Sequence, residues 1–292
     1  MPKKQKNNTS NIATTSDPAR TYRAMRFERI AKETMLASFT SQDKGIGTLA
    51  EKRMHAIIKK FICEDKSCHE IIIGDMLADG DEGKKRKKIT ADVCFDGHIY
   101  EVQTGGFFPL KKKIEWYMTH TADHITVIAP IAAVKYLTWI DPASGVASER
   151  RRSPKRGRVQ DIAKELYWLS DFIGKENFDI SVMLLEIEEY RMQDGWGNGG
   201  KRGSNRYERI PLSLIDEIPL RSKEDYKTHF LPDALPSQFT AADYAKTTRI
   251  RGKATYSMLK ILEALGLIEK SEKIGRAQGY VIPKGDETAD KA

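Results

Sequence analysis

The stretch ITADVCFDGHIYEVQ at residues 89–103 decides the fold, because it has the pattern of a β-hairpin. It contains two short segments rich in β-branched and aromatic residues, and the dipeptide Asp96-Gly97 separates them. Asp-Gly between two such segments is the strongest short-range signal for a tight hairpin turn. We therefore expect antiparallel strands over 89–95 and 98–103.

This hairpin predicts two carboxylates in direct opposition. A two-residue loop pairs Phe95 with His98, and the same register places Asp92 opposite Glu101. Like charges in opposed positions destabilise a sheet, so solvent, a nearby cation, a raised pKa or a bound metal must offset them. The residues alone leave open whether the pair lies on a solvated face or holds a metal such as Mg²⁺, which prefers oxygen ligands. The alternation groups the carboxylates with Thr90, Cys94, Ile99 and Gln103, and it groups the apolar Val93, Phe95, Tyr100 and Val102 on the other face.

The rest of residues 45–220 alternates between helical and strand patterns, which predicts an α/β domain. The expected helices cover 48–61, 107–118 and 159–173, and the expected additional strands cover 69–73, 124–132, 178–187 and 210–220.

The chain divides into four parts by composition. Residues 1–20 are rich in Lys, Asn, Thr and Ser and predict a disordered basic tail. The α/β domain is expected over 21–225, with its core at 45–135. Pro232 and Pro236 mark a boundary before a second unit at 232–283, and a tail follows at 284–292.

Composition excludes several classes of protein. The 292 residues include 40% hydrophobic residues, which excludes a wholly disordered chain. No apolar run approaches the length of a membrane span, and the polar N-terminus lacks a signal-peptide pattern. Three cysteines indicate a reduced, cytoplasmic protein. A net charge of +8 permits a nucleic-acid partner without establishing one.

A resemblance to a known superfamily extends the hairpin reading. The order is a helix bearing Glu51, a strand, Asp92 and then Glu101-Val102-Gln103 on the next strand, followed by a helix. This order resembles the PD-(D/E)XK nuclease superfamily over about residues 45–135. The resemblance implies a restriction-endonuclease-like mixed sheet flanked by helices. It also implies a DNA endonuclease in which Asp92, Glu101 and Glu51 bind Mg²⁺ or Mn²⁺.

Two positions depart from the superfamily pattern. Ala91 stands in place of a Pro, and Gln103 stands in place of the Lys that orients or deprotonates the attacking water. A Gln amide can only orient that water, although some restriction enzymes of the superfamily resemble this chain in carrying Gln there. One of the three lysines at 111–113, on the next helix, could supply the amine that Gln103 lacks, but we favour the interpretation that these lysines form a solvated helix surface. Gln103 keeps open the alternative of a non-catalytic DNA-binding or regulatory protein on a decayed nuclease fold.

Several short segments also resemble a bacterial family of unassigned function, whose members look like a nuclease fold followed by a helix-turn-helix. These segments are EVQTG at 101–105, LKKK at 110–113, API at 129–131 and RRSPKRG at 151–157.

Residues 236–282 are similar to a winged helix-turn-helix. The first helix is expected at 240–246, the recognition helix at 253–265 and the wing at 267–282. Such a module binds duplex DNA or serves as a protein–protein module, and a homodimer is possible. We call residues 149–158 the basic loop. The expected DNA contacts are Arg249, Arg251, Lys253, Thr255 and Tyr256 on the helix-turn-helix, Lys273 and Arg276 on the wing, and Arg151, Arg152, Lys155 and Arg156 on the basic loop.

Two weaker patterns are discounted. Gly195 to Lys201 matches the spacing of a phosphate-binding loop but lacks the following Ser or Thr. Cys63, Cys68 and His69 lack a fourth zinc ligand at a diagnostic spacing.

Overall fold

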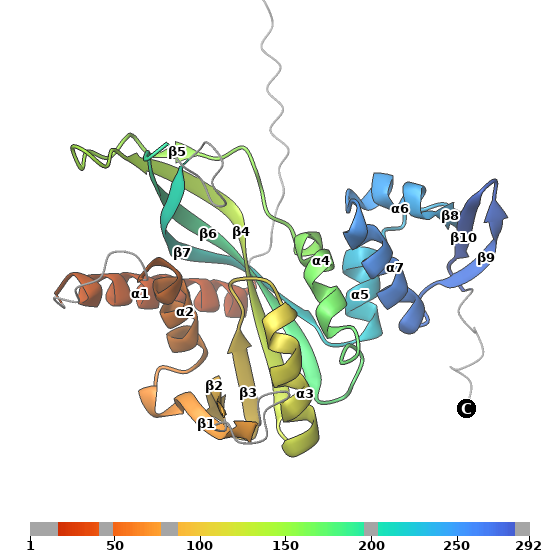
Figure 1. Ribbon diagram of the computed structural model, residues 1–292, viewed down its shortest axis with the longest axis horizontal. Helices are drawn as coiled ribbons and strands as arrows, with labels where there is room; N and C mark the ends of the chain where they lie inside the picture. The colour runs from red at the N-terminus through yellow and green to blue at the C-terminus, as the bar shows by residue number, and fades with distance from the viewer. Residues whose placement is uncertain (1–16, 41–48, 77–86, 196–203, 284–292) are drawn as a thin grey trace, which may run out of the picture.

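The computed structural model of the protein describes residues 17–40, 49–76, 87–195 and 204–283. A large mixed sheet flanked by helices forms the body of the molecule (Figure 1). The predicted terminal tails lie outside the described residues, except that helix α1 (Pro18–Thr40) begins inside the expected N-terminal tail. The chain has a cluster of basic residues at 84–88, and residues 84–86 of it lie outside the described residues, as does most of the Gly195–Lys201 pattern.

The sheet has the order β1-β2-β3-β4-β6-β7, with β5 paired to β4. Neighbouring strands are antiparallel, except that β4 runs parallel to both β3 and β6. The strands are β1 (His69–Met76), β2 (Lys87–Phe95), β3 (His98–Val102), β4 (His124–Ile140), β5 (Arg151–Arg152), β6 (Phe178–Met192) and β7 (Asn205–Leu220).

Helices cover both faces of the sheet and bury two hydrophobic clusters. On one face, α1 and α2 (Leu49–Ile62) pack on Val102, Ile128 and Met183. On the other face, α3 (Lys111–His120) and α4 (Ala163–Leu166) pack on a row that includes Ile99, Val127 and Ile180. Burial on both faces explains why the central strand segments are continuously apolar.

The C-terminal elements share the second of these clusters. They are α5 (Lys223–Phe230), β8 (Gln238–Thr240), α6 (Ala241–Thr248), α7 (Lys253–Ala264), β9 (Glu269–Ile274) and β10 (Ala277–Val281). The three strands form a small sheet in the order β8-β10-β9, at the right of Figure 1. Buried Leu166 and Leu169 belong to the same cluster as Leu259 and Leu262 of α7. The expected boundary at 232–236 therefore has no counterpart in the buried core that the structure describes.

The hairpin is confirmed, while other elements differ from their prediction. Phe95 pairs with His98, and Asp96 and Gly97 have φ values of 50° and 70°, as the tight turn requires. The strands β4, β6 and β7 extend well beyond their expected ends. The added parts of β6 and β7 are rich in charged residues, at 188–192 and 205–209. The expected helix at 159–173 is instead a series of short turns around the four-residue α4.

Within the described residues, no helix is both long and apolar enough to cross a bilayer.

Gly157 holds the basic loop against β4, and an alanine there should destabilise the protein. Its N–H donates to the Ala132 carbonyl at 3.0 Å, and a Cβ at Gly157 would lie 2.5 Å from Ile131 Cγ2. We expect Gly157→Ala to cost about 1–3 kcal/mol of unfolding free energy, measured by urea unfolding. Gly105→Ala is the control, because its Cβ would meet only Gln103 Nε2 at 3.8 Å. Equal stability of the two variants would contradict this packing.

Candidate functional site

Asp92 lies where the regular alternation of β2 is interrupted. Ala91 and Cys94 both pack with the core on the α3 face, although they are three positions apart. The ladder between β2 and β3 ends at Val93–Tyr100, so the expected direct pairing of Asp92 with Glu101 is not formed. Instead, Asp92 Oδ2 accepts the Val102 N–H at 2.8 Å, taking the place of a backbone acceptor.

His55 of α2 provides the second partner of Asp92. Its Nε2 lies 3.0 Å from the same oxygen, Asp92 Oδ2. Burial alone would raise the pKa of Asp92, but the His55 contact and the Val102 N–H outweigh it and hold that pKa below its usual range. Asp92 is therefore an ionised carboxylate that joins the α2 face to the edge of the hairpin.

Glu101 is buried between β3 and α3, with 3% of its surface exposed. Lys113 Nζ donates to Glu101 Oε2 at 2.6 Å, and the Tyr117 hydroxyl donates to Oε1 at 2.8 Å. Lys113 and Tyr117 lie one turn apart on α3 and so face the same side of the helix. Both oxygens of the carboxylate are thus held by one helix.

Burial dominates the electrostatics of Glu101. It raises the pKa of Glu101 to about 7, even though the positive charge of Lys113 acts in the opposite direction. The charge of Asp92 raises the pKa of Glu101 further, and the charge of Lys113 helps to lower that of Asp92. Burial, followed by Glu101, also raises the pKa of Tyr117. The charges of Asp92, Glu101 and Lys113 therefore act on one another.

Lys113 corrects our preferred interpretation of the lysine cluster. We expected a solvated helix surface at 111–113, and for Lys113 this is wrong, because its amine contacts the buried Glu101. Lys111 lies on the surface and pairs with Asp171 at 2.7 Å. The sequence pattern did not indicate His55 or Tyr117 as site residues. The spacing of four between Lys113 and Tyr117 was the available signal.

Gln103 and Glu51 are the other two predicted site residues. Gln103 Nε2 donates to the Gly106 carbonyl at 2.6 Å, so its amide holds the turn that precedes α3. Glu51 lies in α2, one turn before His55, but its side chain is outside the described residues.

The carboxylate oxygens of the cluster already have protein partners: Asp92 Oδ2 contacts His55 and the Val102 N–H, and both oxygens of Glu101 accept from α3. Among the described residues, no group of three or more His, Cys, Asp or Glu side chains could hold a metal. The discounted zinc pattern forms no such group either, and His69 Nε2 contacts the Cys63 carbonyl instead.

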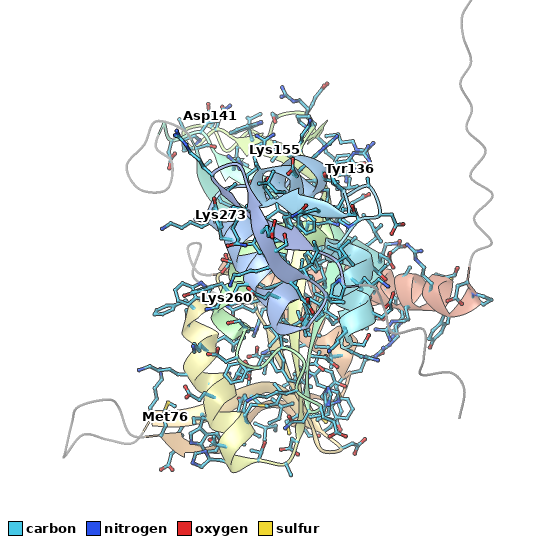
Figure 2. All side chains as sticks on the ribbon, turned by 90° about the vertical axis from the view of Figure 1, so that its right-hand side faces the viewer. Met76, Tyr136, Asp141, Lys155, Lys260 and Lys273 are labelled. Carbon is cyan, nitrogen blue, oxygen red and sulfur yellow. The ribbon has the colours of Figure 1, made fainter. Side chains whose placement is uncertain are left out.

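Two basic segments that are far apart in sequence meet on one side of the molecule. Arg158 Nη1 donates to the Thr248 carbonyl at 3.2 Å, which joins the basic loop to the last residue of α6. Figure 2 views this side, with Lys155 on the loop, Lys260 on α7 and Lys273 on β9 labelled. The predicted contacts Arg151, Arg152, Lys155, Arg156, Arg249, Arg251, Lys253, Tyr256, Lys273 and Arg276 are all exposed.

Thr255 is the exception, and its prediction as a nucleic-acid contact is wrong. It is 3% exposed, and its hydroxyl donates to the Ile250 carbonyl at 2.9 Å. It lies one position before the exposed Tyr256, and α7 turns it toward the core.

Comparison with known proteins places the chain in a family. The domain of unknown function DUF8091 matches residues 52–221. The chain belongs to this family. The matched region includes Asp92, Glu101 and Lys113 and ends before α5. The chain is also similar to an uncharacterized protein of Treponema pallidum (strain Nichols), with 24% identity over 247 residues, covering 82% of this chain and 89% of that protein. No solved structure matches the chain.

The raised pKa of Glu101 predicts a pH dependence of stability. The pKa is about 7 in the folded protein and about 4.3 in an unfolded chain. Between these values the folded state binds more protons, so this contribution is full at low pH and is lost as the pH rises through 7. The loss is on the order of 3 kcal/mol. Urea unfolding at about pH 5 and about pH 8 should show a larger decrease for the wild type than for Glu101→Gln. Equal decreases would show that Glu101 is already ionised at the lower pH.

Proposed function

We propose that this protein is a metal-dependent nuclease that hydrolyses phosphodiester bonds in duplex DNA. The observation that carries the proposal is the cluster of two carboxylates and one amine formed by Asp92, Glu101 and Lys113. Two acidic oxygen donors beside a cationic amine can hold a divalent cation and a phosphate together.

The topology around the cluster supports the proposal. The chain runs through α2, β1, β2, β3, α3 and β4, and the resemblance to PD-(D/E)XK nucleases calls for a helix, a strand, the two acid-bearing strands and a helix in that order. The two carboxylates lie on adjacent strands, β2 and β3.

Asp92 and Glu101 would hold Mg²⁺ or Mn²⁺, with Glu51 as a further proposed ligand. When bound, the ion lowers the pKa of its water and stabilises charge on the phosphate. Binding requires an ionised Glu101, and a pKa of about 7 makes proton and metal compete for this carboxylate near neutral pH. Metal affinity should therefore rise with pH in this range.

In this proposal Lys113 supplies the cationic amine that Gln103 cannot supply. Its amine lies 2.6 Å from Glu101 Oε2 and comes from α3 rather than from the position two residues after Glu101. Lys113 would orient the attacking water or the scissile phosphate. His55 would fix the orientation of Asp92, and Tyr117 would fix that of Glu101.

We further propose that the C-terminal elements act as a winged helix-turn-helix. The order β8, α6, α7, β9, β10 matches that module, with α7 as the recognition helix and the β9–β10 turn as the wing. The N-terminal end of a recognition helix reads the major groove, and Lys253 and Tyr256 are exposed at that end of α7. The adjacent basic loop would contact the phosphate backbone.

One observation favours the alternative of a non-catalytic DNA-binding protein. Gln103 is engaged with Gly106 in its own turn rather than with the carboxylates. In this alternative the basic side of the molecule binds DNA, and the Asp92–Glu101 cluster serves only to hold α2 and α3 on the sheet.

Cleavage of supercoiled plasmid in Mg²⁺ or Mn²⁺ separates the two functions. Asp92→Asn and Glu101→Gln should lower the rate by about 100-fold or more, because each removes a metal ligand. Lys113→Met should lower it by about 100-fold, while Lys112→Met, on an exposed neighbouring residue, should stay within about threefold. Thermal melting of each variant confirms folding. A folded wild type that binds DNA without metal-dependent cleavage would support the alternative and contradict the nuclease.

Duplex binding should depend on the start of α7. We expect Arg251→Gln/Lys253→Gln to weaken binding and to reduce the slope of log affinity against log salt by about 0.9 per lost phosphate contact. Fluorescence anisotropy over a salt series measures both quantities. Arg29→Gln/Lys32→Gln on α1 is the charge-matched control. An equal effect of the two double variants would indicate bulk charge rather than a defined interface.

A further inference from the structure

The turn between α2 and β1 carries two of the three cysteines of this protein, and the proposed site uses neither. Cys63 follows the last residue of α2, and Cys68 ends the short 3-10 helix Lys66–Cys68 that leads into β1. Four residues separate the two cysteines. All three cysteines of the chain are unpaired in this structure, and the third, Cys94, lies on β2.

Hydrogen bonds fold this turn back on itself. The Cys68 N–H donates to the Asp65 carbonyl at 3.2 Å, and the Asp65 carboxylate accepts the Ser67 N–H at 2.8 Å. These two bonds form the 3-10 helix. His69 Nε2 then lies 2.8 Å from the Cys63 carbonyl oxygen. The residue that follows Cys68 is therefore held against Cys63, and the two ends of the turn meet.

This folding brings the two thiols into contact. The Cys68 S–H donates a hydrogen bond to the Cys63 sulfur, and this contact, followed by burial, raises the pKa of the Cys68 thiol. Both cysteines are half-buried, and the residues between them, 64–67, are exposed. A small molecule can therefore reach the pair from solvent.

An adjacent thiol changes the fate of an oxidised cysteine. A cysteine that reacts with a small disulfide first becomes a mixed disulfide, and a neighbouring thiol can displace the small thiol from it. A neighbour that is already in position makes this displacement intramolecular and hence fast. Cys94 provides the internal comparison, because burial and the charge of Asp123, rather than another thiol, raise its pKa.

The turn also belongs to the packed body of the molecule. Glu64, between the two cysteines, pairs with Arg26 at 3.1 Å and with Arg29 at 2.9 Å, and both arginines lie on α1. The turn thus joins α1, α2 and the start of β1 (Figure 1). These attachments hold both cysteines in place, so that the contact of their thiols is maintained in the folded chain.

We infer that Cys63 and Cys68 form a reversible thiol–disulfide pair that small-molecule disulfides oxidise. The Cys63 thiolate, which the hydrogen bond from Cys68 stabilises, attacks one sulfur of the small disulfide and releases one small thiolate. The Cys68 sulfur then gives up its proton, attacks the Cys63 sulfur and releases the second small thiolate. The pair loses two electrons and two protons, the small disulfide takes up both, and a dithiol reductant reverses the reaction.

The test exposes the full chain to oxidised glutathione, alkylates the remaining thiols and maps the cysteine peptides by mass spectrometry. We expect the wild type to form the Cys63–Cys68 disulfide and to lose it on treatment with a dithiol reductant. In Cys63→Ser and in Cys68→Ser the remaining cysteine of the turn should instead carry glutathione, because no thiol is left to displace it. Cys94→Ser is the matched control and should keep the disulfide.

A redox titration gives the strength of the pair. At a fixed concentration of oxidised glutathione, the disulfide should survive at least about tenfold more reduced glutathione than the mixed disulfide of Cys63→Ser, because its second thiol is held in place. Glutathione on both Cys63 and Cys68 of the wild type, without a bond between them, overturns the inference. Complete alkylation of both thiols after excess oxidised glutathione, or a disulfide that includes Cys94, overturns it as well. None of these outcomes depends on DNA binding or cleavage.

Discussion

Burial of the Glu101 carboxylate between β3 and α3 is the constraint on which the proposed site depends. An unpaired buried charge costs several kcal/mol, so α3 must present partners to both oxygens. Lys113 and Tyr117 do so from consecutive turns, and this fixes the rotation of the helix on the sheet. The same rotation brings the amine of Lys113 close enough to influence Asp92. A packing requirement of the core thus produces the charge arrangement of the site.

Two buried glutamates in this protein have opposite electrostatic outcomes. Glu101 has one amine and one hydroxyl as partners, and burial prevails, so its pKa rises to about 7. Glu189 of β6 has four cations as neighbours, and they prevail over burial and lower its pKa. The number of cations around a buried carboxylate therefore decides whether it holds a proton near neutral pH or stays ionised.

The sequence predicted what local chemistry determines and missed what packing determines. Asp96-Gly97 fixed the hairpin and its register, because a two-residue turn allows few alternatives. It could not show that Asp92 leaves the ladder to accept the Val102 N–H, because that depends on α2 bringing His55 to the same oxygen. Lys113 was assigned to solvent because neighbouring lysines on a helix usually are solvated. Thr255 was predicted to contact nucleic acid, but its hydroxyl instead donates to the Ile250 carbonyl just before α7. The extensions of β6 and β7 were missed because their charged residues do not continue the apolar run of each strand.

The continuity of the buried core decides how the C-terminal elements can act. Leu166 and Leu169 pack with Leu259 and Leu262, and Arg158 donates to the Thr248 carbonyl across the same contact. The start of α7 and the basic loop therefore have fixed relative positions, unlike two domains joined by a flexible linker. In the proposed function, a rigid connection would let both segments engage one duplex without the entropic cost of ordering a linker. It also means that removing residues 232–292 would expose the leucines of the α4 region, so loss of DNA binding in such a truncation would report loss of the core rather than loss of an interface.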